Sequence, residues 1–233
     1  MTAELDRIKS QYSKRNKDNM ALSYQSFLPY IYMSRQEKER KLYSLLRKNN
    51  INIPLATLLE IGCGRGGKIL DLLQMGFSPG NLMGNELMED NLEYAKKRLP
   101  QSVQLFSGDA RALQLKESSL DIVYQSMVFS SILDDEFQEE LANLMWKWVK
   151  PGGSVLWYDF AFNNPNNPNV RGVSMSRVKE LFPEGKLLSK RVTLAPPLSR
   201  MVTKIHPSLY TLLNAIPLLR THRLCFITKP TEP

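Results

Sequence analysis

The feature that most limits how this chain folds is a glycine-rich turn between an apolar run and a helical pattern. Residues 56–61 form an apolar run typical of a buried strand, and Gly62, Gly64 and Gly67 follow it. Residues 69–73 then repeat apolar side chains at helical spacing. A turn without β-carbons at a helix start lets the backbone approach a ligand closely. The pattern therefore predicts a strand, a ligand-binding turn and a helix in succession.

Strand-like and helix-like segments alternate along the rest of the chain. We expect further strands at about 81–87, 103–106, 120–125, 154–160, 187–194 and 221–228, and helices at about 34–49, 91–99, 134–149 and 174–182. The first of these helices is expected to begin at Ser34, which forms a capping box with Glu37. This alternation favours the α/β class, with a doubly wound, mostly parallel sheet. Ligands of such sheets bind at the carboxyl ends of the strands.

Acidic residues stand at three of these predicted strand ends. Glu60 precedes the glycine turn, where its charge disfavours a pyrophosphate and suits a ligand with an ammonium or sulfonium group. Glu86 ends the next strand, where a carboxylate can accept two ribose hydroxyls. Asp109 ends the third strand and can accept from an adenine amino group. The three acids favour a cationic adenosyl ligand over a dinucleotide.

Composition limits the class of protein. Hydrophobic residues make up 42% and charged residues 23%, as in ordinary folded domains. No apolar run approaches the ~20 residues of a membrane helix, and the charged N-terminus lacks the apolar core of a secretory signal. Two cysteines are too few for a disulfide framework, and we expect no metal site. We therefore expect a cytoplasmic protein.

Charge is distributed unevenly along the chain. The net charge is +6 over residues 1–50, −6 over 51–170 and +8 over 171–233, which gives +8 in total. Basic flanks around an acidic centre indicate an anionic partner, or serve only solubility.

Five segments in order resemble the successive motifs of class I S-adenosylmethionine-dependent methyltransferases. They are LLEIGCGRGGKILDLL, GNEL, GDARAL, LDIVYQSMVFSSILDD and VKPGGSVLWYDF, within residues 51–162. The resemblance implies a Rossmann-like sheet of seven strands whose last strand is antiparallel and lies between the fifth and sixth. It also implies S-adenosyl-L-methionine as cofactor. The end of the chain is similar to a bacterial subgroup associated with polysaccharide or other secondary biosynthesis.

The resemblance assigns roles to residues at the strand ends. Glu60, Gly62 and Gly64 would line the methionine part of the cofactor, and Glu86 would accept its ribose hydroxyls. The adenine would meet three further residues, Leu87, Asp109 and Ala110. Gln125, with Ser126, would lie under the sulfonium.

Residues near the fifth strand are the candidates for acceptor chemistry. A hydroxyl or amine acceptor benefits from a general base. We expect Asp159 in this role first and His206 second, with Tyr158 facing the acceptor at the same edge.

The loop 163–172 is rich in asparagine and proline. Its amides, including those of Asn164 and Asn167, can pair with the hydroxyls of a sugar, and Arg171 can bind a phosphate or carboxylate. The alternative is a series of Asx turns that only connects two elements.

The predicted organisation is a helical lid segment at residues 1–50 and the methyltransferase domain at 51–233. Tyr24, Tyr30 and Tyr32 would form an aromatic wall or a hydrophobic staple in the lid. Residues 195–219, between the last two strands, read as an amphipathic cap over the substrate or as an element at a membrane surface.

The function expected from these observations is O-methylation of a small-molecule or glycan acceptor. Nucleic acid is an alternative substrate, raised by the sequence pI of about 9.4. It is disfavoured here because no Asn/Asp-Pro-Pro-Tyr/Phe motif follows the fourth strand, where YQSMVF stands instead. The other alternative is a non-catalytic module that binds S-adenosylmethionine or NAD.

Overall fold

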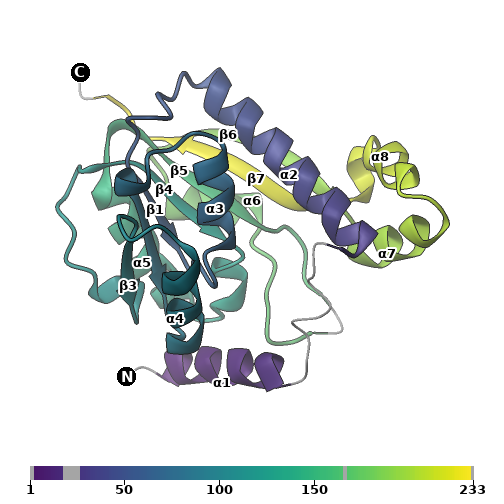
Figure 1. The fold of residues 1–233 in the computed structure, drawn as a ribbon, viewed down its shortest axis with the longest axis horizontal. Helices are drawn as coiled ribbons and strands as arrows, with labels where there is room; N and C mark the ends of the chain where they lie inside the picture. Colours follow the sequence, from purple (N-terminus) through teal and green to yellow (C-terminus); the bar gives the residue numbers. More distant parts are fainter. Residues whose placement is uncertain (1–2, 18–26, 165–166, 232–233) are drawn as a thin grey trace.

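The computed structural model describes residues 3–17, 27–164 and 167–231 (Figure 1). Seven strands form one sheet in the order β3-β2-β1-β4-β5-β7-β6. The strands are β1 (Leu58–Ile61), β2 (Leu82–Glu86), β3 (Gln104–Ser107), β4 (Leu120–Ser126), β5 (Val149–Phe160), β6 (Lys186–Leu194) and β7 (Arg220–Thr228). The first five pair in parallel, whereas β7 pairs antiparallel with both β5 and β6. The expected seven-stranded fold, with an antiparallel last strand inserted before the sixth, is confirmed.

Helices cover both faces of this sheet. They are α1 (Ala3–Lys17), α2 (Pro29–Lys48), α3 (Gly67–Gln74), α4 (Glu89–Arg98), α5 (Asp135–Trp148), α6 (Met175–Leu181), α7 (Pro196–Ile205) and α8 (Ser208–Asn214), with 3₁₀ turns η2 (Pro79–Asn81), η3 (Ala110–Ala112), η4 (Phe129–Ser131) and η5 (Pro217–Leu219). Helices α2, α3 and α4 bury apolar side chains on one face. Helices α1, α5 and α6 bury theirs on the other. This arrangement makes the doubly wound α/β fold.

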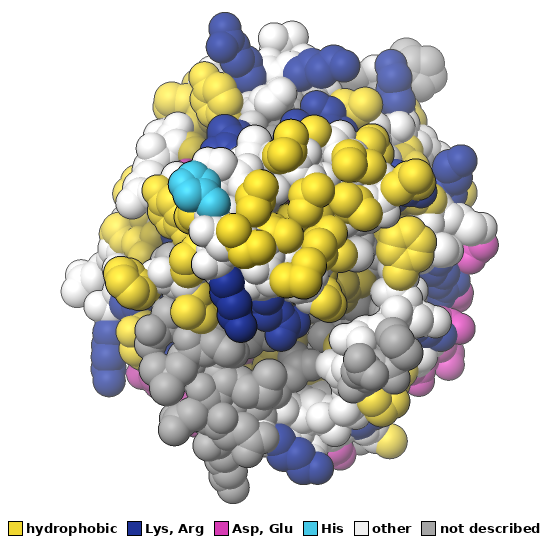
Figure 2. Space-filling model, turned by 90° about the vertical axis from the view of Figure 1, so that its right-hand side faces the viewer, with side chains coloured by type: hydrophobic (Ala, Val, Ile, Leu, Met, Phe, Trp, Pro, Cys, Tyr) yellow, Lys and Arg dark blue, Asp and Glu magenta, His cyan; other side chains and the backbone are white. Residues whose placement is uncertain are grey.

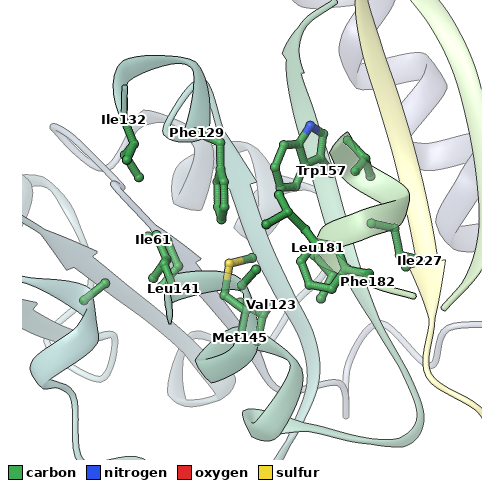
Figure 3. Packing of buried hydrophobic residues seen from close by; sticks show 14 of the residues in the cluster. Ile61, Val123, Phe129, Ile132, Leu141, Met145, Trp157, Leu181, Phe182 and Ile227 are labelled. Atoms are coloured by element: carbon green, nitrogen blue, oxygen red, sulfur yellow. The ribbon is translucent and has the colours of Figure 1, made fainter. Parts of the chain in front are cut away.

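The core on the α5 side is built around large side chains from four elements. Phe129 and Trp157 pack with ring centres 4.4 Å apart, and Phe182 meets the edge of Trp157 at 6.1 Å (Figure 3). Met145 of α5 and Val123 of β4 are fully buried in the same cluster. This packing holds η4, the turn after β4, against β5.

Two element boundaries differ from the sequence expectation. Helix α2 begins at Pro29 rather than at Ser34, because proline is well suited to the first helical position. The Ser34 hydroxyl donates to the Ile31 carbonyl within the helix, so the expected capping box does not form. Strand β5 begins at Val149 rather than near 154, since Val149 pairs with Leu120 across an irregularity in the register.

Helices α7 and α8 lie beyond the β6 edge of the sheet, at the right of Figure 1. Figure 2 faces this side, where hydrophobic side chains gather among lysines and arginines. Met201, Ile205 and Leu212 are 58, 76 and 67% exposed there. No helix in the described part of the chain is long and apolar enough to cross a membrane. The cap role of residues 195–219 stays a prediction.

Candidate active site

A cavity of about 150 Å³ opens at the carboxyl ends of β1, β2 and β4, against α1. Seven residues that the sequence predicted to hold the cofactor, or to lie beside it, line this cavity. They stand at or just after the strand ends and are Gly62, Gly64, Glu86, Leu87, Asp109, Ala110 and Ser126. The structure thus brings together residues that are far apart in the sequence. This is the edge at which ligands of parallel sheets bind.

The glycine turn shapes one wall of the cavity. Gly62 and Gly64 have φ of +67° and +56°, a left-handed conformation that glycine adopts without strain. A β-carbon on Gly62 would lie 2.7 Å from Cγ2 of Val128. The turn therefore requires glycine, both for its backbone conformation and for its close approach to the segment after β4.

Glu86 joins the glycine turn to the end of β2. Its carboxylate accepts the Gly64 N–H at 2.8 Å and the Met88 N–H at 2.9 Å. Burial raises the pKa of this carboxyl, while the Met88 and Gly64 N–H bonds oppose the rise. Each carboxylate oxygen has a second lone pair that can accept a ribose hydroxyl. The buried carboxylate and the open glycine cradle fit an adenosyl ligand.

Asp109 lies at the other end of the cavity. Its carboxylate accepts the Arg111 N–H at 3.0 Å and forms an ion pair with the Arg111 guanidinium at 2.9 Å. The guanidinium carbon lies 3.6 Å from the ring centre of Phe137, which also lines the cavity. Asp109 is therefore held in place, with Leu87 and Ala110 beside it in the wall.

Two of the predicted cofactor residues lie behind the cavity wall. Glu60 is 2% exposed, and burial raises its pKa to about 8 although Lys68 and Lys38 lie nearby. Gln125 is fully buried, and its side-chain oxygen accepts the Val128 N–H at 3.0 Å. Because side chains alternate along a strand, Ser126 reaches the cavity instead of Gln125. The cofactor roles of Glu60 and Gln125 stay predictions.

Neither candidate general base lines the cavity. Asp159 is 1% exposed, and its two oxygens accept the Ser130 N–H at 3.1 Å and the Phe160 N–H at 2.9 Å. Burial raises the pKa of Asp159 to about 6. His206 ends α7 in an exposed position, where its Nδ1 accepts the Ser208 N–H at 3.2 Å. The structure therefore keeps Asp159 in the core and His206 among the helices beyond the β6 edge.

Tyr158 faces α2 on the opposite side of the sheet from Asp159. Its hydroxyl lies 2.9 Å from that of Thr193, and its ring stacks on His222 with centres 5.1 Å apart. The side chain is 6% exposed. Its expected contact with the acceptor stays a prediction.

The Asn-rich loop makes turn contacts. The Asn167 side-chain oxygen accepts the Asn169 N–H at 3.1 Å, and the Asn167 N–H donates to the Asn164 carbonyl at 3.0 Å. The Arg171 guanidinium pairs with Asp135. These contacts are those of connecting Asx turns. Pro165 and Asn166, like Tyr24 of the lid, lie outside the described residues.

The sequence predicts a lid at residues 1–50 but did not single out the apolar side chains of α1 that line the cavity. Leu5, Ile8 and Tyr12 line the cavity, together with Ile132 from the segment after β4 and Phe137 of α5. The apolar spacing of Leu5, Ile8 and Tyr12, three and four residues apart, is the signal that could have revealed this face. Among the described residues, no cluster of histidine, cysteine and acidic side chains could hold a metal ion.

Residues 58–153 match the family described as a methyltransferase domain. The fold and this match identify a class I S-adenosylmethionine-dependent methyltransferase domain in the chain, with S-adenosyl-L-methionine as its cofactor. A methyltransferase from Archaeoglobus fulgidus superposes with a TM-score of 0.57 at 17% identity, over 86% of this chain and 99% of that one. A second methyltransferase, from Methanosarcina mazei, superposes with a TM-score of 0.58 at 14% identity, over 80% of this chain and 98% of that one.

The chain is also similar to curated tRNA methyltransferases. It is 31% identical over 111 residues to tRNA N(3)-cytidine methyltransferase METTL2 of Gallus gallus. The matched region covers 44% of this chain and 30% of that protein. It is 28% identical over 113 residues to tRNA N(3)-methylcytidine methyltransferase trm140 of Schizosaccharomyces pombe, over 45% and 36%. The matched region is thus only about a third of these relatives' length.

These relatives contradict two expectations from the sequence. The main expectation was a small-molecule or glycan hydroxyl as acceptor, and nucleic acid was considered an unlikely partner; the names of the curated relatives point to tRNA. The error came from the missing Asn/Asp-Pro-Pro-Tyr/Phe motif. That motif is only one way of holding an amino group in a methyltransferase. Its absence therefore does not rule out a nucleic-acid substrate. Nothing among the matches confirms polysaccharide biosynthesis or a bacterial source.

Proposed function

We propose that this chain transfers a methyl group to a ring nitrogen of a base in RNA, with tRNA cytidine as the first substrate to test. The similarity to tRNA N(3)-cytidine methyltransferases over 111 residues carries the proposal. The matched family spans the strands that form the cavity. The net charge of +8 adds attraction to a phosphate backbone.

The cofactor supplies an activated methyl group on a positively charged sulfur. The residues of this chain hold it: Glu86 and Asp109 offer acceptors, and the glycine turn allows close approach. Helix α1 contributes Leu5, Ile8 and Tyr12 to the cavity wall, and we expect it to limit the access of water to the bound cofactor. Ser126, at the end of β4, lines the cavity, and we expect the methyl group and its acceptor to meet beside it.

A ring nitrogen of cytosine has a free lone pair, so its methylation needs no proton removal. The positive charge moves from the sulfur to the base, and the enzyme has mainly to align the two atoms. The burial of Asp159 and the exposed position of His206 suit such a reaction, because neither has to act as a base. This proposal therefore assigns Asp159 a role in holding η4.

Two expectations about organisation belong to the same proposal. Residues 1–50 serve as a lid, since α1 covers the cavity, while α2 packs on the other face of the sheet. The protein works in the cytoplasm, and the two buried free cysteines suit a reducing compartment. Cell fractionation tests the location.

The test is methyl transfer from labelled S-adenosylmethionine to tRNA, followed by nuclease digestion and mass spectrometry of the nucleosides. We expect a methylated cytidine. Glu86→Ala should abolish most incorporation, because it removes the acceptor for the Gly64 and Met88 amides. A wild-type protein that binds S-adenosylmethionine but labels no RNA would refute the proposal.

A further inference from the structure

Helix α2 packs on the sheet over β5 and β6, and none of its residues lines the cavity. Ser126 of β4 lines the cavity and lies opposite Tyr158 in the neighbouring strand β5. Two residues further along, Phe160 lies opposite His222 of β7. Since side chains two residues apart share a face, Ser126, Tyr158 and His222 form a path across the α2 side of the sheet. The path leads from the cavity toward the β6 edge.

Lys38 of α2 lies over this path. Its Nζ is 4.5 Å from the ring centre of Tyr158. Within the described parts of the chain no hydrogen bond or ion pair engages this ammonium, whereas Arg35, one turn earlier, pairs with Asp71. The Tyr158 hydroxyl is already engaged with Thr193. Lys38 therefore has donors without an oxygen acceptor.

The buried carboxylate of Glu60 does not supply that acceptor. Glu60 interacts electrostatically with Lys38, yet the two form no ion pair, and one oxygen of Glu60 is buried without a partner among the described residues. Burial lowers the pKa of Lys38 to about 8. Lys38 is half-buried, and its Nζ is not among the fully buried polar atoms that lack a partner. Its unused donors can therefore be reached by a ligand oxygen that replaces water.

The position of Lys38 relative to the cavity indicates whether the cofactor or the methylated substrate supplies the oxygen that accepts a hydrogen bond from Lys38. The cavity walls come from the ends of β1, β2 and β4, from the segments after β2, β3 and β4, and from α1 and α5. Lys38, Tyr158 and His222 are absent from those walls. They lie on the β5 and β7 side of Ser126. Methyl transfer requires the molecule that receives the methyl group to lie in line beyond it. We therefore assign this side of the cavity to the methylated substrate.

We propose that Lys38 binds the target nucleotide, with its ammonium donating to an oxygen of that nucleotide beside the Tyr158 ring. The oxygen is either the base carbonyl or a phosphate oxygen, both of which accept from lysine. This inference rests on the proposed function and assigns it an acceptor-binding residue.

Lys38→Met tests it, because methionine keeps the apolar stem over Tyr158 and removes the charge. Lys48→Met on the same helix, at an exposed position, removes the same charge elsewhere. We expect Lys38→Met to lower kcat/KM for tRNA at least tenfold while the Kd for S-adenosylhomocysteine, measured by calorimetry, changes less than threefold. Lys48→Met should change both less than threefold, and Lys38→Arg should restore part of the activity.

Binding of cytidine and of cytidine monophosphate to the protein saturated with S-adenosylhomocysteine, measured by ligand-observed NMR, distinguishes the two oxygens. If Lys38→Met weakens the binding of both ligands equally, Lys38 donates to the base carbonyl. If it weakens the binding of cytidine monophosphate alone, Lys38 donates to the phosphate.

Three outcomes would overturn the inference. Weaker binding of S-adenosylhomocysteine in Lys38→Met, as large as the loss of turnover, would place the ammonium at the cofactor. Unchanged tRNA kinetics in Lys38→Met would refute only the role of Lys38. A wild-type protein that neither methylates tRNA nor binds nucleotide would refute this inference and the proposed function together. Lys38-dependent nucleotide binding without RNA methylation would support the inference and refute the function.

Discussion

At the scale of single residues, two carboxylates at strand ends have different surroundings. Glu86 and Asp159 both accept two backbone N–H groups, yet Glu86 lines the cavity and Asp159 does not. The sequence placed both at strand ends, and the glycine turn and Asp109 as well. It could not show which side of its strand each side chain occupies, because that depends on the register and twist of neighbouring strands.

Asp159→Asn separates a positioning role from a chemical one. The asparagine amide can accept only one of the two N–H groups from Ser130 and Phe160, so we expect a loss of about 1–3 kcal/mol in unfolding free energy. Turnover per folded molecule should fall less than threefold. Denaturant melts and RNA methylation assays measure the two quantities. A hundredfold loss of kcat with unchanged stability would make Asp159 a catalytic base.

At the scale of elements, two charged side chains of α1, Glu4 and Arg7, hold this helix over the cavity. Glu4 accepts the Leu133 N–H at 2.6 Å and pairs with Arg7 at 2.7 Å, while Arg7 donates to the Ser131 carbonyl. The hydrogen bond from Arg7 lowers the pKa of Glu4. Leu5 and Ile8, each 7% exposed, thereby face the cavity.

Glu4→Ala should loosen this helix. Hydrogen bonds to charged groups contribute about 1.5–3 kcal/mol each, so we expect S-adenosylmethionine affinity to fall roughly tenfold or more. Cleavage near residue 14 by trypsin should become faster. Asp6→Ala, at an exposed position in the same turn, is the control. Equal cofactor affinity in both variants would show that α1 does not act as a lid.

At the scale of the whole molecule, buried titratable groups link stability to pH. Burial lowers the pKa of His222 from 6.5 to about 3, so the folded protein holds this side chain neutral. A depressed folded-state pKa contributes stability above pH 6.5 that is lost as pH falls toward 3. Glu60 acts in the opposite direction, because its raised pKa favours the folded state at low pH and this gain is lost as pH rises through about 8.

His222→Phe isolates the histidine contribution. The aromatic ring keeps the stack on Tyr158, which has centres 5.1 Å apart, and removes the titration. Relative to wild type, we expect the variant to gain up to about 1.4 kcal/mol per pH unit below 6.5. Denaturant melts between pH 7.5 and 4 measure the difference, with His206→Phe as the exposed control. Parallel profiles for wild type and His222→Phe would contradict the assignment.

The sequence by itself determined the α/β class, the glycine turn, the order of strands implied by its motifs, and the acids at three strand ends. The class, the turn and the acids follow from local patterns, namely the spacing of apolar residues, glycines and charges within about ten residues. The order of the strands came instead from the resemblance of the motifs to class I S-adenosylmethionine-dependent methyltransferases. Only the tertiary structure decided that Leu5 and Ile8 of α1 face the cavity, that Asp159 faces the core and that Lys38 meets Tyr158. Each of these joins residues more than a hundred positions apart, or depends on which face of a strand a helix covers, and packing of the whole chain sets both.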